Sequence, residues 1–146
     1  MNAGEALDYQ RRARPLLGTL VEIGVGSNAP AQGIDAAFDA IESAQRALSR
    51  FDPHSDIARF NAAAVGARLA VRPLTCDVLR AACELASASD GMFDISTGTG
   101  ADGWSLEGEA LIKHGASTCL DLGGIGKGHA VDLAIDALIA NGCASG

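Results

Sequence analysis

The chain has 146 residues, of which 48% are hydrophobic and 20% charged, a balance typical of a globular domain with its own core. The net charge of −7 argues against DNA or RNA binding, because that function needs a positive surface to neutralise phosphates. No apolar run approaches the roughly 20 residues that cross a bilayer, and the N-terminus has no signal-peptide pattern. We therefore expect a cytoplasmic protein without a transmembrane segment.

The first third of the chain predicts a strand followed by a helix. Alternating apolar residues at Val21, Ile23 and Val25 favour a strand over residues 16–25. Apolar residues then recur at helical spacing over residues 31–48, with acidic and basic residues between them, which predicts an amphipathic helix.

The middle of the chain predicts a loop, a weak strand and a second long helix. Residues 51–61 read as a loop with local order, in which Ser55 can cap a short helical turn. A weak strand is expected over 65–71, and Thr75 is a plausible N-cap for a helix over 76–89.

The last third predicts a polar loop, a short strand and a final helix. The loop covers residues 93–103, the strand covers 117–122, and the helix ends at Asn141-Gly142, a natural C-cap. We expect an α+β fold over residues 1–146 as a single domain, with helices packed on a mixed or antiparallel sheet. The sheet should be incomplete at the C-terminal edge, because a strand-helix unit normally continues into another strand.

The four cysteines predict free thiols. Cys76, Cys83, Cys119 and Cys143 form no CxxC pair and have no histidine at metal-ligand spacing. If they are helical, the first two lie about 10.5 Å apart along the axis, too far for a disulfide. We interpret all four as buried free thiols.

Residues 121–132, DLGGIGKGHAVD, are the strongest candidate for a binding site. Glycines allow positive φ and close approach to a ligand, a helix N-terminus attracts anions, and Lys127 adds a cation, so this segment can cradle a pyrophosphate. A glycine-rich turn needed only for tight packing is the alternative. The segment is not a Walker A loop, because Asp121 and Gly128 stand where that motif has glycine and Ser or Thr.

Three other features carry weaker signals. Gly98, Gly100 and Gly103 match GxGxxG, but the strand and helix of a dinucleotide-binding unit are missing around them. Asp94, like Asp121, can accept hydrogen bonds from a flavin or ribose or lie near a metal, or it can simply form a turn. We assign His129 no catalytic role.

Four segments in order resemble the N-terminal half of the FAD:protein FMN transferases, the ApbE family. They are LLGTLVEI at 16–23, LSRFDPHSDIARFN at 48–61, SDGMFDIS at 89–96 and DLGGIGKGHAVD at 121–132. The resemblance implies FAD as substrate, Mg²⁺ as cofactor, transfer of FMN to a threonine hydroxyl of an acceptor protein, and release of AMP. It also implies that the acceptor is a subunit of a membrane redox complex, and it makes a periplasmic, inner-membrane-associated location the alternative to the cytoplasm.

The resemblance also implies which residues contact the ligand. It places near FAD the residues Leu17, Phe51, Met92, Phe93, Asp94, Asp121 and Lys127, and it gives the backbone carbonyl of Gly124 to Mg²⁺.

The sequence departs from the family pattern at several positions. Leu17 replaces a usual methionine, Phe51 a usual tyrosine, Gly126 a usual alanine and His129 a usual tyrosine. The aspartates and threonine that complete the family's Mg²⁺ site have no counterpart here. A truncated, non-catalytic protein that binds flavin nucleotides is therefore the alternative function, and a purely structural α+β module is a third.

Overall fold

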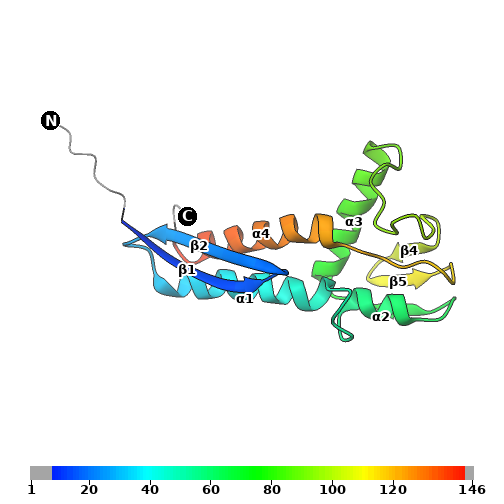
Figure 1. The fold of residues 1–146 in the computed structure, drawn as a ribbon, viewed down its shortest axis with the longest axis horizontal. Helices are drawn as coiled ribbons and strands as arrows, with labels where there is room; N and C mark the ends of the chain where they lie inside the picture. The colour runs from blue at the N-terminus through cyan, green and yellow to red at the C-terminus, as the bar shows by residue number, and fades with distance from the viewer. Residues whose placement is uncertain (1–7, 144–146) are drawn as a thin grey trace. The chain divides into compact units, whose positions relative to one another are not determined.

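The computed structural model describes residues 8–143, and the contacts within it divide the chain into two compact units. One unit consists of Met1–Ser43 and Ala130–Gly146, and the other of Ala44–His129. Figure 1 shows the order of helices and strands along the chain. The expectation of a single domain over 1–146 stays a prediction. Within residues 8–143, no helix is both long and apolar enough to span a bilayer.

The first unit opens with an antiparallel hairpin. Strand β1 covers Tyr9–Leu16 and β2 covers Thr19–Gly26, and the two residues between them, Leu17 and Gly18, have φ of 55° and 71°. Positive φ at both central residues is the turn geometry that matches strand twist in two-residue hairpins. The strand expected over 16–25 is therefore the second arm of a hairpin, and β1 was missed because leucine replaces the asparagine or aspartate that usually marks such a turn.

Two long helices contribute to both units. Helix α1 covers Ala31–Leu48, as the sequence predicts, and α4 covers Gly123–Ala140. In the first unit a Cβ atom at Gly33 would lie 2.5 Å from Sγ of Cys143, so only glycine allows the start of α1 to approach the end of α4 this closely. The C-cap expected at residues 141–142 is confirmed, because Gly142 has φ of 82°.

The second unit contains two helices and a small sheet. Helix α2 covers Asp56–Ala62 and α3 covers Pro73–Ala88. The strands β3 (Arg68–Ala70), β5 (Ala110–Lys113) and β4 (Trp104–Glu107) lie in that order, and both pairings are antiparallel. The sheet and helices enclose a core that includes the buried residues Ile57, Phe60, Val78, Leu79, Leu111, Leu120 and Leu122. The α+β class with antiparallel sheets is confirmed.

A buried carboxylate ties α2 to α3. Asp56 is 1% exposed and accepts hydrogen bonds from the backbone amide and guanidinium of Arg72, both at 2.8 Å, and from Oγ1 of Thr75 at 2.6 Å. The prediction that Thr75 caps α3 is wrong, because its hydroxyl bonds this carboxylate and the helix begins at Pro73. The cap expected from Ser55 is confirmed, since its side chain accepts an amide hydrogen bond at the start of α2.

Residues 119–121 are held by three separate tethers. The amide of Cys119 donates to Oγ1 of Thr99 at 2.9 Å. The amide of Leu120 donates to the side-chain oxygen of Asn61 at 2.7 Å, and the carbonyl of Leu120 accepts from the side-chain nitrogen of Asn61 at 3.0 Å. The amide of Asp121 donates to the carbonyl of Ile95 at 2.8 Å. The strand predicted over 117–122 is wrong, since these tethers replace a strand ladder.

The thiol prediction is confirmed in part. All four cysteines are free, but only Cys76 and Cys143 are buried, whereas Cys83 and Cys119 are exposed.

The tether at Thr99 predicts different effects for two substitutions at this position. Thr99→Val keeps the volume but removes the oxygen, so we expect a loss of about 1 kcal/mol in the free energy of unfolding. Thr99→Ser keeps the oxygen and should retain most of the stability. Urea unfolding measures both, and equal stability of the valine variant and the native chain would contradict the tether.

Candidate functional site

The glycine-rich segment forms the first turns of α4. Helix α4 begins at Gly123, and none of the glycines in the described stretch 123–128 has positive φ, so the positive-φ loop expected there is wrong. The lack of side chains has two effects. A Cβ at Gly126 would lie 3.4 Å from Cδ1 of Leu48, so this glycine serves tight packing, whereas Cβ atoms at Gly124 and Gly128 would meet nothing within 4 Å. One side of the helix start is therefore open.

Asp121 lies two residues before this helix and has two partners. One carboxylate oxygen accepts the amide hydrogen of Gly123 at 2.9 Å, and the other lies 3.5 Å from Nε of Arg50. The guanidinium of Arg50 also lies over the ring of Phe51, 4.6 Å from its centroid. The structure thus brings two predicted ligand residues, Asp121 and Phe51, into contact with one arginine.

Lys127 provides a second cation at the start of α4. Its side chain is exposed and has no hydrogen bond or ion pair with any residue in the range 8–143. The N-terminal end of a helix is electrostatically positive, and unpaired cations nearby add to that potential. Lys127 and the helix start therefore favour an anionic group such as a phosphate, beside Arg50, whose charge is partly balanced by Asp121.

Asp94 holds its own turn. Its carboxylate accepts hydrogen bonds from the amide and hydroxyl of Ser96 and from the amide of Gly98 at 3.2 Å. The hydrogen bond from the Ser96 hydroxyl, assisted by those amides, lowers the pKa of Asp94 below its ordinary value, so this carboxylate stays ionised at neutral pH. These contacts show that Asp94 forms a turn, which is one of the two roles that the sequence left open. The other role, a contact with FAD, stays a prediction.

A pocket of about 690 Å³ lies within the second unit beside this turn. Phe93 and Asp94 line it together with Trp104 of β4 and Arg80 of α3. Ile95 also lines it, and the Ile95 carbonyl accepts the amide hydrogen of Asp121. A backbone hydrogen bond therefore joins Ile95 in the pocket wall to Asp121, which lies two residues before α4.

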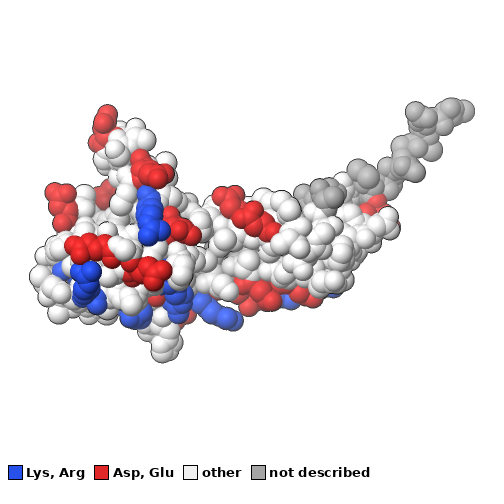
Figure 2. Space-filling view, turned by 180° about the vertical axis from the view of Figure 1, so that it is seen from behind, with Lys and Arg blue, Asp and Glu red and all other residues white. Residues whose placement is uncertain are grey.

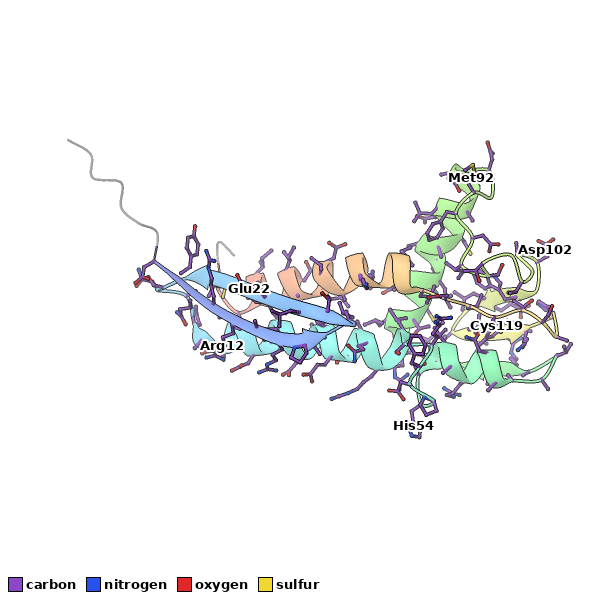
Figure 3. All side chains as sticks on the ribbon, viewed as in Figure 1. Arg12, Glu22, His54, Met92, Asp102 and Cys119 are labelled. Atoms are coloured by element: carbon purple, nitrogen blue, oxygen red, sulfur yellow. The ribbon has the colours of Figure 1, made fainter. Side chains whose placement is uncertain are left out.

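Two other predicted ligand residues do not line this pocket. Met92 is 89% exposed and lies at the turn after α3, as Figure 3 shows. Leu17 belongs to the first unit, where it is half-buried in the hairpin turn with φ of 55°, a backbone conformation that is uncommon for leucine.

Sequence reasoning missed several residues that shape the site. Arg50 and Asn61 lie inside the motif at 48–61, so the motif was recognised but the role of each residue within it was not. Trp104, the only tryptophan of the chain, lies outside all four motifs. Their roles depend on contacts between segments that lie far apart in sequence, and no local pattern encodes such contacts.

The described residues do not by themselves fit a magnesium ion. Mg²⁺ requires near-octahedral oxygen coordination, usually from carboxylates and phosphates as well as water. Among residues 8–143 no group of three His, Cys, Asp or Glu side chains is placed to hold a metal. Gly124 lies inside α4, where a carbonyl is normally bonded to the amide four residues on, so only its second lone pair would remain for a metal.

Charged side chains of both signs share the surface. On the face shown in Figure 2, acidic and basic side chains are interspersed, and no continuous basic stripe is visible. The expectation that the chain does not bind nucleic acid stays a prediction.

The fold is similar to that of several solved structures. The flavinyl transferase ApbE of Pseudomonas stutzeri, in its apo form, matches with a TM-score of 0.83 and 24% identity over 93% of this chain and 51% of that chain. The flavin transferase ApbE of Vibrio cholerae matches with a TM-score of 0.84 and 20% identity over 93% and 55% of the two chains. An ApbE protein of Thermotoga maritima matches with a TM-score of 0.83 and 21% identity over 92% of this chain and 54% of that chain.

The chain thus spans about half the length of the solved proteins that it resembles, as the sequence led us to expect. A search of curated proteins gives no match. The model of the ApbE family matches residues 17–113, which is more than half of the chain. With the fold and this match in agreement, the chain belongs to the ApbE family.

Proposed function

We propose that this chain forms the FAD-binding half of a flavin transferase that moves FMN from FAD to a threonine hydroxyl of an acceptor protein. The observation that carries the proposal is the start of α4, where Arg50, Asp121 and Lys127 meet an open helix N-terminus in a chain of the ApbE family. Its structural neighbours from P. stutzeri and V. cholerae are a flavinyl transferase and a flavin transferase.

FAD consists of two ring systems joined by a diphosphate, so its binding site needs two kinds of surface. The diphosphate requires cations and backbone amides, which Arg50, Lys127 and the first turn of α4 provide. Asp121 holds Arg50 near this helix start and accepts the first helical amide. Its role in the proposal is to orient these groups, since a carboxylate would repel the diphosphate if it faced it directly.

The transfer step exchanges a phosphoanhydride bond for a phosphoester bond. The threonine oxygen forms a bond to the FMN-side phosphorus, the bond from that phosphorus to the bridging oxygen breaks, and AMP leaves with that oxygen. The hydroxyl proton goes to a base that the described residues do not identify. Charge builds up on the phosphoryl oxygens and on the leaving AMP, so cations near the diphosphate stabilise the transition state as well as bound FAD.

The remaining parts of the reaction belong to the proposal as well. Mg²⁺ would neutralise charge on the diphosphate when bound, but it would need ligands beyond those of residues 8–143. The partner would be a flavin-acceptor protein that presents a threonine, such as a subunit of a membrane redox complex. We propose that turnover requires polypeptide equivalent to the part of the solved relatives that this chain does not cover.

Titration of the chain with FAD tests the binding half of the proposal. Flavin fluorescence should report saturable binding, and Lys127→Gln should weaken it about tenfold, because one charge-assisted contact to phosphate is lost. Arg68→Gln is the matched control, since it removes an exposed cation that pairs with Glu107 on the sheet. Equal losses in both variants would indicate a nonspecific effect of charge, and no binding by the folded native chain would refute the proposed function.

Magnesium should bind weakly to the chain when FAD is absent. Because the described residues offer no carboxylate cluster, calorimetry should give a dissociation constant weaker than about 1 mM for Mg²⁺ alone. Any strengthening of FAD binding by Mg²⁺ should then depend on the diphosphate, and riboflavin should show none. Stoichiometric micromolar binding of Mg²⁺ to the FAD-free chain would contradict this prediction.

A further inference from the structure

We propose that the buried Lys113 is a positioning residue that fixes the start of α4 through the side chain of Asn61. Lys113 lies outside the four sequence motifs. The inference rests on the proposed function for its effect on FAD, whereas its effect on the fold can be measured without a ligand. Three observations support it: the burial of the ammonium, its contacts at the end of α2, and the two hydrogen bonds between Asn61 and Leu120.

Lys113 is buried without a carboxylate partner. It ends β5, the central strand of the small sheet, and is 2% exposed. Lysine is almost never buried this completely unless it is paired, because its ammonium loses its hydration shell. Within residues 8–143, however, the ammonium forms no ion pair with a carboxylate. The groups that it does contact must therefore offset the cost of its burial.

The ammonium of Lys113 contacts the end of α2. Its Nζ atom donates to the carbonyl of Phe60 at 3.3 Å and to the carbonyl of Asn61 at 3.1 Å, and it lies 5.2 Å from the centroid of the Phe60 ring. The last carbonyls of a helix have no amide four residues on to bond, and this end of a helix is electrostatically negative. A cation placed there beside an aromatic ring is stabilised, and it ties the last turn of α2 to β5.

Asn61 carries this constraint to the segment before α4. Its side-chain oxygen accepts the amide hydrogen of Leu120 at 2.7 Å, and its side-chain nitrogen donates to the carbonyl of the same residue at 3.0 Å. Two hydrogen bonds from one planar amide to one residue fix both the position and the orientation of that residue. Lys113 thus holds the backbone of Asn61, and Asn61 holds the backbone of Leu120.

The effect reaches the anion-binding end of α4 along the backbone. Leu120 precedes Asp121, whose carboxylate accepts the amide hydrogen of Gly123 and pairs with Arg50. If the end of α2 moved, the tether to Leu120 would lengthen and weaken, and these groups would lose their fixed position. Lys113 therefore influences the proposed diphosphate site without contacting the ligand.

Hydrogen exchange in Lys113→Met tests the positioning without a ligand. Methionine keeps most of the side-chain length but removes the donor, so the Leu120 amide should exchange about tenfold faster relative to the Val71 amide. The Val71 amide is the internal control, because it donates to the carbonyl of Glu109 at 3.0 Å in the same unit. A general loss of stability would speed both amides equally, so an unchanged ratio would overturn the inference.

A double-mutant cycle tests the route through Asn61. Lys113→Met should weaken FAD binding about tenfold in the native chain but have no further effect in Asn61→Leu, where the tether is already lost. In Thr99→Val the tenfold loss should persist, because Thr99 holds Cys119 separately. A tenfold loss in all three backgrounds would show that Lys113 acts by another route and would contradict the inference.

The native chain offers a measurement that needs no variant to fold. Lys113 and Lys127 are its only lysines, so isotope-labelled lysine gives two ammonium signals in nitrogen NMR. The Lys113 signal should persist in water, since its ammonium is buried and hydrogen-bonded. Titration with FAD should shift it with the dissociation constant that flavin fluorescence gives, because coupling between two sites is reciprocal. An unchanged Lys113 signal at saturating FAD would refute the inference.

The outcomes separate this inference from the proposed function. If FAD binds the native chain and folded Lys113→Met equally well, the inference is wrong while the proposed function stands. If the native chain does not bind FAD, the proposed function fails, and the exchange ratio of the Leu120 and Val71 amides alone decides whether Lys113 positions the segment. If FAD does not bind and the ratio is unchanged, both are wrong.

Discussion

The tethering of residues 119–121 is the interaction on which the rest of the site depends. This segment leads into α4 without belonging to any sheet, so its backbone groups need other partners. Asn61, Thr99 and the carbonyl of Ile95 provide them from three separate parts of the second unit. The direction in which α4 starts, and with it the position of Asp121, is set by two side chains and one backbone carbonyl that bond this segment.

These tethers also bring segments of three motifs of the chain together. Asn61 ends the motif at 48–61, Ile95 lies in the motif at 89–96, and Asp121 begins the motif at 121–132. The tether at Ile95 therefore joins one motif directly to another, and the tether at Asn61 holds Leu120, the residue just before the last motif. Spacing along the sequence varies freely when the loops between motifs change length, but these hydrogen bonds require a fixed arrangement in space.

Sequence patterns predicted those features that depend on local chemistry. Helix α1 follows from helical periodicity, the start of α2 from Ser55, and the end of α4 from Gly142. The failures involve distant partners: Thr75 resembles an N-cap until the buried carboxylate of Asp56 takes its hydroxyl. The glycines of α4 likewise suggested a loop, because no local signal shows that Leu48 packs against Gly126 or that Gly124 and Gly128 face open space. The candidate ligand residues came from the family motifs, and the pocket beside Trp104 needed the fold.

The distribution of charge limits what these residues can contribute to catalysis. Contacts that hold FAD equally well before and during the reaction lower its dissociation constant without speeding the transfer. Binding of the two ring systems of FAD would be of this kind, since the rings do not change during phosphoryl transfer. On the proposed function, only the groups near the phosphorus, Lys127, Arg50 and the first amides of α4, respond to charge that develops there. Because these groups would also attract the diphosphate of bound FAD, the proposed function expects them to lower its dissociation constant more than they speed the transfer.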